Sequence, residues 1–432
     1  MKFIVEPGGS MTGSLRVPGD KSMSHRTVMF GALAEGTTTA TGFLEGQDAL
    51  CTVQAFKDMG VTIRGPEQGR IEIDGVGMHG LKAPERVLDM GNSGTSIRLL
   101  SGLLAPQSFD SVMTGDVSLQ KRPMGRVTTP LALMGAVIES EDGKPPLTVR
   151  GGNVLKGIHY EMPMASAQVK SCVLLAGMYA EGRTSIIEPA TTRDHTERML
   201  CGFGYEVECE NDVISLQGGG ALKATSLDIP ADISSAAFFL VAASIAEGSD
   251  LILEHVGMNP TRSGVITILT LMGADIEVLN EREVGGEPVA DLRVRSAPLT
   301  GIEIPEDLVP LAIDEFPVLF IAAACASGKT VLSGAEELRV KESDRIASMA
   351  EGLTRLGIKN DVREDGIAIV GGQITGGEVD TFHDHRIAMS FSVAALRASG
   401  PIHVNDCDHV ATSFPGFAAL ARGVGLSISE AG

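Results

Sequence analysis

The sequence lacks the long apolar runs that mark membrane proteins. No stretch reaches the about 20 consecutive apolar residues that a membrane-spanning helix requires. The segment Met1–Pro7 has no long apolar core before its acid and its proline, so we do not expect it to be a secretory signal. The six cysteines form no Cys-x-x-Cys pair, and several lie in apolar surroundings where a reduced thiol fills space. These absences predict a protein of the reducing cytoplasm with no membrane partner.

Basic residues are also scarce. The chain has 35 Lys and Arg against 55 Asp and Glu, which gives a formal net charge of -20 at pH 7. Binding to nucleic acid or to an anionic membrane requires a positive surface, so this balance argues against both partners. The 432 residues exceed the roughly 100 to 200 residues of a usual domain, and 43% of them are hydrophobic. We therefore expect two domains, each with a sizeable core.

One pattern recurs six times along the chain. A helix-like segment ends in a hydrophobic residue plus glycine, and an alternating, strand-like segment follows. The glycines are Gly60, Gly135, Gly204, Gly273, Gly357 and Gly425, separated by 75, 69, 69, 84 and 68 residues. Alternating helices and strands occur in any α/β protein, but they do not predict this near-constant spacing. The pattern therefore indicates six repeats that each contain strand, helix, strand, helix and strand.

A second pattern marks five of the six repeats. An apolar helix ends at Ala-x-Gly and an extended segment rich in Thr and Ile begins, at residues 34–36, 180–182, 246–248, 326–328 and 398–400. Glycine at such a place is typical of a left-handed helix C-cap.

The first helix of each repeat begins with small, capping or charged residues. These starts are 19–26, 91–98, 165–170, 231–235, 313–317 and 383–386. Ser, Asn and Asp cap the free backbone N–H groups there, which also receive anions. Capping does not explain Lys21, Arg26, Gln168, His385 and Arg386. The cations among them oppose the dipole at a helix start unless an anion lies nearby. If the repeats place these helices side by side, their starts form one anion pocket.

Two loops add further cations. Lys121 and Arg122 precede Arg126 in one loop, and the segment 339–345 alternates basic and acidic residues. Alternating charge on a helix is usually a solvated face. Together with the other cations, the segment 339–345 predicts a clamp for an anionic ligand.

Three rival motifs fit poorly. Residues 326–330 end like a phosphate-binding loop, but Ala323 replaces its first glycine. Residues 75–80 match Gly-x-Gly-x-x-Gly, yet no helix follows them. His383, Asp384 and His385 are metal-ligand types, but adjacent residues rarely all face one ion. We expect no metal and no cofactor.

The motifs together resemble the 5-enolpyruvylshikimate-3-phosphate synthases, in order and over essentially the whole chain. The segments that carry the resemblance are 19–26, 91–95, 121–125, 339–345 and 384–389. The resemblance implies an α/β fold of two similar domains, each of three repeated βαβαββ-type units, with the active site in the interdomain cleft. It implies one discontinuous domain of residues 1–16 plus 231–432 and a second of residues 17–230.

The resemblance also implies the substrates and the residues that bind them. Shikimate-3-phosphate would contact Lys21, Ser22, Arg26, Ser166, Ala167, Gln168, Arg193, Asp314 and Lys341. Phosphoenolpyruvate would contact Lys21, Gly94, Arg122, Gln168, Lys341, Arg345, His385 and Arg386. Phosphate and carboxylate groups pair well with forked guanidinium groups, so these residue types make physical sense.

The implied reaction adds a hydroxyl to C2 of phosphoenolpyruvate while C3 gains a proton, and then eliminates phosphate. Such chemistry requires an acid and a base on opposite sides of a bond, plus fixed cations. The resemblance assigns Asp314, Glu342 and Lys21 to catalysis, with no metal or organic cofactor. Without it, Asp314 would be interpreted as a helix N-cap and Glu342 as part of a solvated ion pair.

This sequence departs from the commonest family pattern at several positions. Ala167 stands where many members have a second Ser, and Arg193 where others have Tyr. Residues 411–415 lack a Lys that many members carry, and Lys341 is the candidate substitute. The stretches 162–168 and 192–195 resemble the second class of these enzymes, whose glyphosate-insensitive members often carry Ala at the position of Gly94. We therefore predict that Gly94 leaves room for glyphosate.

Three other functions compete with this interpretation. The enolpyruvyl transferase that acts on UDP-N-acetylglucosamine shares the fold and the reaction, but it usually carries a Cys in the loop equivalent to 115–126, and none occurs here. An RNA 3'-phosphate cyclase would need nucleic-acid contacts that the acidic balance disfavours. A non-catalytic anion-binding protein would explain the cations but not Asp314 and Glu342. We expect a monomer with small-molecule substrates.

Overall fold

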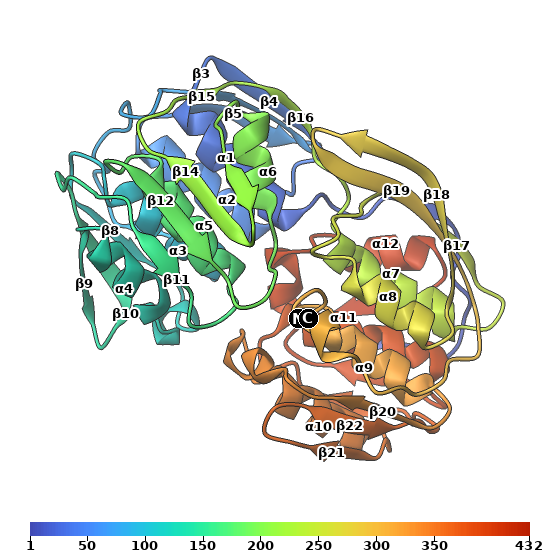
Figure 1. Cartoon of the computed structure of the whole chain (residues 1–432). Helices are drawn as coiled ribbons and strands as arrows, with labels where there is room; N and C mark the ends of the chain where they lie inside the picture. Colours follow the sequence, from blue (N-terminus) through green and yellow to red (C-terminus); the bar gives the residue numbers. More distant parts are fainter. The chain divides into compact units, whose positions relative to one another are not determined.

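The computed structural model describes residues 1–432, and the chain folds into two units (Figure 1). Unit 1 contains Met1–Pro18, Pro230–Glu283 and Glu287–Gly432. Unit 2 contains Gly19–Ile229 together with Val284–Gly286. Each unit has one hydrophobic core of its own.

Six small sheets, three in each unit, repeat one strand arrangement. The sheets of unit 2 have the orders β16 (Ser226–Asp228), β4 (Thr37–Thr41), β6 (Arg70–Asp74), β5 (Thr62–Glu67); β7 (Leu88–Asp89), β8 (Ser111–Thr114), β10 (Lys144–Arg150), β9 (Val137–Glu141); and β11 (His159–Glu161), β12 (Arg183–Ile187), β14 (Val213–Gln217), β13 (Glu208–Glu210). In each of them the first pair is parallel and the next two pairs are antiparallel. A two-stranded sheet of β15 (Leu222–Lys223) and β3 (Ala34–Glu35) completes this unit.

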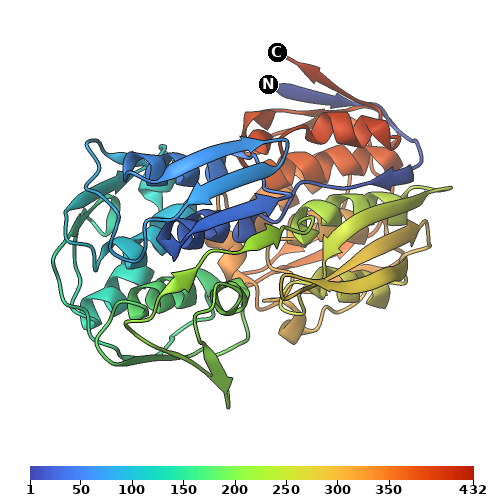
Figure 2. The same cartoon turned by 90° about the horizontal axis from the view of Figure 1, so that it is seen from above.

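The sheets of unit 1 follow the same plan. Their orders are β23 (Gly377–Val379), β24 (Ile402–Val404), β1 (Lys2–Val5), β25 (Ile428–Ala431); β18 (Asp275–Val284), β19 (Glu287–Arg295), β17 (Asp250–Gly257), β2 (Thr12–Leu15); and β20 (Lys329–Leu332), β22 (Ile367–Val370), β21 (Asn360–Val362). In the three-stranded sheet, a parallel bridge from Glu303 to Val331 lies where the fourth strand would be. Strand β1 brings the N-terminus into the same sheet as the C-terminal strand β25, and Figure 2 shows these two strands side by side.

The helices fall into an inner and an outer set. The inner set is α1 (Lys21–Leu33), α3 (Gly94–Leu104), α5 (Ala167–Gly177), α7 (Ile233–Ile245), α9 (Phe316–Cys325) and α11 (His385–Ala394). The outer set is α2 (Gln47–Asp58), α4 (Gly125–Leu133), α6 (His195–Gly202), α8 (Gly264–Leu271), α10 (Arg345–Arg355) and α12 (Phe417–Gly423). Every residue of α7 is buried, which is typical of a helix that is apolar on all sides. In unit 1 the helices α7, α9 and α11 pack on one another, and in unit 2 helix α3 packs on both α1 and α5.

The glycines of the first sequence pattern confirm the repeat. All six follow an outer helix and have positive φ, from 78° at Gly204 to 119° at Gly425. Glycine adopts this left-handed conformation without the penalty that a Cβ brings. Four glycines of the second pattern also have positive φ, namely Gly36, Gly182, Gly248 and Gly328. The expected left-handed cap at Gly400 is wrong, because Pro401 follows it and favours extended backbone at the residue before it.

The α/β fold with two similar, three-repeat units is thus confirmed. It places the starts of three inner helices close together within each unit. No helix has both the length and the apolar character needed to cross a membrane.

Candidate active site

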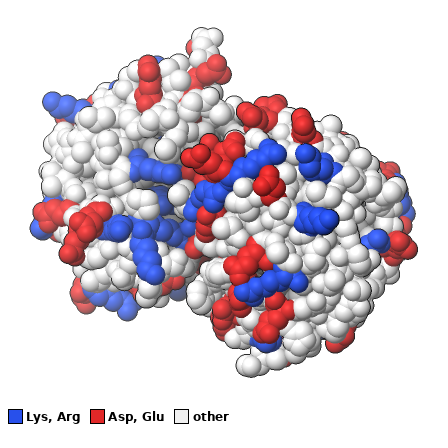
Figure 3. Space-filling model, turned by 90° about the horizontal axis from the view of Figure 1, so that it is seen from below, with Lys and Arg blue, Asp and Glu red and all other residues white.

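The predicted site residues fall on the starts of the inner helices and on adjoining loops of each unit. Unit 2 contains Lys21, Ser22, Arg26, Gly94, Arg122, Ser166, Ala167, Gln168 and Arg193, and unit 1 contains Asp314, Lys341, Glu342, Arg345, His385 and Arg386. Figure 3 shows that Lys and Arg side chains gather among acidic ones on the visible face of both units. Within each unit, hydrogen bonds and ion pairs join several of these residues to neighbouring helix starts.

Side chains cap five of the six inner helices. Asp20, Ser93, Ser166, Asp232 and Asp384 each accept a hydrogen bond from a backbone N–H in the first turn of their helix. Helix α9 is the exception, because its N-cap residue Glu315 makes no capping hydrogen bond. The interpretation of Asp314 as a plain N-cap is therefore wrong. The side chains of Asp314 and Glu315 bind other groups.

In unit 2, polar contacts join the starts of α3 and α5. The Arg98 guanidinium donates to Oε1 of Gln168 at 2.6 Å, and Nε2 of Gln168 donates to Oγ1 of Thr95 at 3.1 Å. Nη2 of Arg122 donates to Oδ1 of Asn92 at 2.7 Å, just before α3. These bonds fix Arg98, Gln168 and Arg122 around the start of α3.

Two cations of α1 reach neighbouring helices of unit 2. The Lys21 ammonium donates to the carboxylate of Asp48 at the start of α2. Arg26 is 3% exposed, and its guanidinium donates to Thr196 Oγ1 at 2.7 Å and to Ser171 Oγ at 2.8 Å. Because those partners lie on α6 and α5, Arg26 ties three helices together as well as carrying a charge.

A buried lysine secures the loop that carries Arg193. Lys170 on α5 contacts Glu197 at 2.8 Å and Glu188 at 3.2 Å, and it donates to the backbone oxygen of Thr192 at 3.2 Å. Burial raises the pKa of Glu197, and the nearby Lys170 ammonium partly offsets that rise. The loop from Glu188 to Thr192, which precedes Arg193, is therefore held at both ends by Lys170 of α5.

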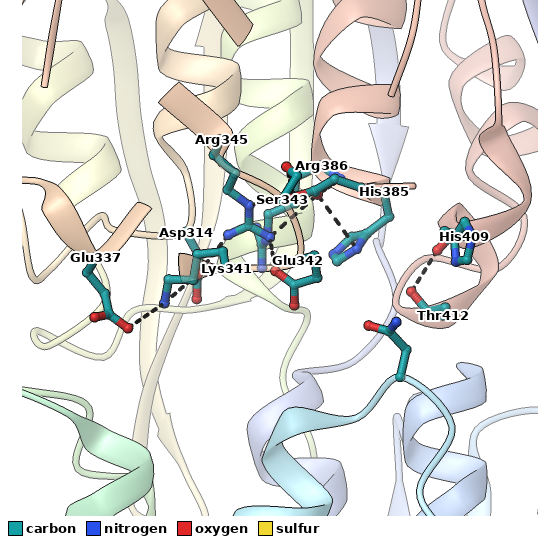
Figure 4. Close-up of polar contacts among 12 residues, drawn as sticks. Asp314, Glu337, Lys341, Glu342, Ser343, Arg345, His385, Arg386, His409 and Thr412 are labelled. Carbon is teal, nitrogen blue, oxygen red and sulfur yellow. Dashed lines mark hydrogen bonds and ion pairs between the residues drawn. The ribbon is translucent and has the colours of Figure 1, made fainter. Parts of the chain in front are cut away.

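In unit 1, Arg345 is the centre of a cluster of carboxylates (Figure 4). It is 1% exposed. Its Nη1 donates to Oδ1 of Asp314 at 3.1 Å and its Nη2 to Oε2 of Glu342 at 2.6 Å. Its Nε donates to Oδ2 of Asp384 at 2.9 Å. Burial lowers the pKa of Arg345, but the three carboxylates raise it above its ordinary value, so the guanidinium stays charged.

Three more predicted residues lie beside this cluster. The Lys341 ammonium is 3.6 Å from Oδ1 of Asp314 and 3.9 Å from Oε1 of Glu337. His385 is buried at the start of α11, where its Nδ1 lies 4.0 Å from Oδ1 of Asp384. Arg386 donates its backbone N–H to Asp384, and its guanidinium lies 3.9 Å from the carboxylate of Glu315. Unit 1 thus holds basic and acidic groups side by side.

Asp384 makes the stability of unit 1 sensitive to acid. Burial raises its pKa and so does Glu342, but Arg345 and His385 lower it, and the pKa lies below its usual value. An acid with a lowered pKa stabilises the folded state above the ordinary Asp pKa of about 3.9, and this contribution is lost as the pH falls. We expect Asp384→Asn to lower the thermal unfolding midpoint at pH 7. The difference from the unsubstituted protein should shrink below about pH 4, and calorimetry across that range would measure it.

Sequence reasoning missed several partners of the predicted residues. Asp48, Asn92, Arg98, Thr196 and Glu315 contact predicted site residues, but none of them was predicted as a site residue. Asp48 and Thr196 also lie outside every helix start and motif that the sequence analysis named. Among these partners, Glu315 was the easiest to find from the sequence, because it is a second acid beside Asp314. The others lie up to 170 residues from their partners, and only the fold shows the contact.

The cluster residues are not arranged to hold a metal ion. No group of three or more His, Cys, Asp or Glu side chains has such an arrangement. Asp384 binds Arg345, and the ring of His383 packs edge-on against the ring of His409 at 5.2 Å.

Comparisons with known proteins give one consistent family. The sequence model of EPSP synthase (3-phosphoshikimate 1-carboxyvinyltransferase) matches residues 5–420. A 3-phosphoshikimate 1-carboxyvinyltransferase of Alkalilimnicola ehrlichii is 66% identical over 432 residues, which cover 100% of this chain and 97% of that protein. The enzyme of the same name from Methylococcus capsulatus is 64% identical over 427 residues, or 99% of this chain and 98% of that protein. A solved structure of an EPSP synthase from Acinetobacter baumannii matches with a TM-score of 0.90 and 61% identity, covering 99% of both chains.

Proposed function

This chain belongs to the EPSP synthase family, and from that premise we propose that it transfers the enolpyruvyl group of phosphoenolpyruvate to the 5-hydroxyl of shikimate-3-phosphate. The products are 5-enolpyruvylshikimate-3-phosphate and inorganic phosphate. The reaction belongs to the shikimate pathway of aromatic amino acid biosynthesis.

The observation that supports this function best is the pair of carboxylates on one guanidinium. Asp314 and Glu342 accept hydrogen bonds from Nη1 and Nη2 of Arg345, so their positions relative to each other are set by one rigid, planar group. An addition to a double bond requires one group to take a proton and another to supply one. Two oriented carboxylates beside Lys341 and Arg386 provide these groups without a metal.

We assign the steps to these residues as follows. Asp314 takes the proton of the attacking hydroxyl as its oxygen bonds to C2, and Glu342 supplies a proton to C3, with Lys21 assisting. The tetrahedral intermediate then loses a proton from C3 and the C2–O bond to phosphate, which restores the double bond. Glu342 regains its proton from C3 in this elimination, and the proton that Asp314 took from the hydroxyl leaves with the phosphate, so both carboxyl groups return to their starting state.

The cations neutralise the substrates. Lys21, Arg122, Lys341, Arg345, His385 and Arg386, with Gly94 and Gln168, form the proposed set for phosphoenolpyruvate. Ser22, Arg26, Ser166, Ala167, Gln168 and Arg193 form most of the set for shikimate-3-phosphate. A forked guanidinium binds phosphate or carboxylate oxygens in pairs, and a doubly anionic transition state gains most from such fixed charges.

Phosphate release tests the proposal directly. The purified protein is mixed with phosphoenolpyruvate and either shikimate-3-phosphate or UDP-N-acetylglucosamine, and inorganic phosphate is measured together with the mass of the new enol ether. We expect phosphate and product only with shikimate-3-phosphate. Release only with UDP-N-acetylglucosamine, or release with neither acceptor, would contradict the proposal.

The space around Gly94 leads to a prediction about inhibition by glyphosate. A Cβ at this position would lie 2.9 Å from Nη1 of Arg122 and 3.1 Å from Nη1 of Arg98. Both atoms are ends of flexible side chains, so Gly94→Ala would fold but would displace the two guanidinium groups. We expect the inhibition constant for glyphosate to rise at least tenfold, with a smaller rise in KM for phosphoenolpyruvate. Steady-state kinetics measure both, and an unchanged inhibition constant would contradict the prediction.

A further inference from the structure

Glu315 is a buried acid that the reaction itself does not use. It lies directly after Asp314 at the start of α9, and it is 2% exposed. A buried carboxylate is costly unless it is paired and hydrogen-bonded. Its side chain does not cap α9, so its partners must be found on other elements.

Those partners form a chain of contacts across the starts of α7, α9 and α11. Oγ of Ser234 donates to Oε1 of Glu315. Nη2 of Arg262 donates to Oγ of Ser234 at 2.6 Å and to Oδ1 of Asp232 at 3.1 Å. On the other side, Nη1 of Arg386 lies 3.9 Å from Oε1 of Glu315. Two acids and two bases are present, so their formal charges cancel.

The directions of these hydrogen bonds fix the position of the Glu315 carboxylate. The Ser234 hydroxyl has one proton, which it donates to Glu315, while it accepts a hydrogen bond from Arg262. Arg262 is 3% exposed and also binds Asp232, so the chain is fixed at its far end. The carboxylate that faces Arg386 is therefore held by groups that do not move with Arg386.

Arg386 forms an ion pair with Glu315 but donates no hydrogen bond to it. The distance of 3.9 Å is an ion-pair distance but is longer than a hydrogen bond. The guanidinium of Arg386 makes no hydrogen bond within the protein, and its side chain is 13% exposed. Its N–H groups therefore remain available for a ligand, whereas those of Arg345 are bonded to carboxylates.

We infer that Glu315 is a positioning residue that orients the Arg386 guanidinium toward the anionic groups of phosphoenolpyruvate. The inference rests on the proposed function, because it takes Arg386 as a ligand of that substrate. Charge attraction from a fixed, buried carboxylate limits the directions in which Arg386 can point. The proton-transfer groups Asp314 and Glu342 are not part of this chain of contacts. Loss of the Glu315 charge should therefore weaken binding of one substrate and leave the chemical step nearly unchanged.

The test is the variant Glu315→Gln, which keeps the volume and can still accept from Ser234, but has no charge. We expect KM for phosphoenolpyruvate to rise at least tenfold, with kcat and KM for shikimate-3-phosphate within about threefold of the unsubstituted enzyme. Glu315→Asp retains the negative charge on a side chain that is one methylene shorter. Its KM for phosphoenolpyruvate should lie between that of Glu315→Gln and that of the unsubstituted enzyme. Glu351→Gln, which removes an exposed acid of α10 paired with Arg355, is the control and should change neither KM.

The outcomes separate the inference from the function on which it rests. If the unsubstituted protein releases no phosphate with shikimate-3-phosphate, the proposed function fails whatever the variants do. If it is active but Glu315→Gln leaves KM for phosphoenolpyruvate within twofold, only the positioning role fails. If both KM values rise together and the unfolding midpoint falls, Glu315 is merely structural and the inference is overturned. Should Glu315→Gln not fold, Ser234→Ala removes the hydrogen bond that orients Glu315, and an unchanged KM for phosphoenolpyruvate in that variant would overturn the inference too.

Discussion

Glu342→Gln will lower kcat by about 100- to 10,000-fold, and Asp314→Asn will do the same, because each removes a group that transfers a proton. Both amides keep the shape of the acid and can still accept a hydrogen bond from Arg345, as the carboxylates do at 2.6 Å and 3.1 Å. The cluster should therefore stay folded. KM for either substrate should change little, since all the cations proposed to bind the substrates remain and the amide of Asn can still contact the hydroxyl.

Single-turnover kinetics distinguish a loss of chemistry from a loss of binding. Rapid mixing of variant, shikimate-3-phosphate and phosphoenolpyruvate should show a slow formation of the tetrahedral intermediate with an almost normal dependence on substrate concentration. Glu351→Gln serves as the matched control, because it also removes one carboxylate paired with an arginine, on the exposed side of α10. Turnover within threefold of normal in Glu342→Gln would remove Glu342 from the mechanism.

The fold could be predicted because its repeats leave local signals. A helix that ends in glycine with positive φ, followed by a strand, can be recognised within about ten residues, and all six glycines of the first pattern take that conformation. The burial of every residue of α7, and of all residues of α9 except Cys325, is equally local, because both helices are apolar on nearly every side. Gly400, which belongs to the second pattern, shows the limit, since one following proline prevents the left-handed conformation there.

The candidate site could be predicted only in part. Side chains at helix starts, such as Lys21 and Arg386, are conspicuous because a cation there opposes the helix dipole. Their partners have no such signal. Thr196 is 170 residues from Arg26, and Asp314 is 31 residues from Arg345, so neither contact follows from spacing. The sequence also gives no indication that the guanidinium of Arg345 is bonded to three carboxylates, whereas that of Arg386 is not hydrogen-bonded within the protein.

Arg345→Met will produce the largest combined loss of stability and activity. The substitution removes the cation that Asp314, Glu342 and Asp384 share in a buried place. Breaking a buried ion pair by removing one partner costs about 3 to 5 kcal/mol in the free energy of unfolding, because the remaining charge is uncompensated. Without the guanidinium, neighbouring carboxylates raise each other's pKa. We therefore expect a lower unfolding midpoint and an acid limb of the kcat profile that moves to higher pH.

Arg345→Lys distinguishes two roles for this residue. A lysine keeps the charge and can attract an anionic substrate, but it cannot offer three carboxylates the fixed, planar set of donors that a guanidinium provides. If Arg345 acts mainly by binding phosphoenolpyruvate, Arg345→Lys should raise KM for that substrate and leave kcat nearly normal. If it acts mainly by holding Asp314 and Glu342, kcat should fall at least 100-fold with a smaller change in KM. The contacts of Arg345 favour the second result, because its Nε, Nη1 and Nη2 each donate to a different carboxylate.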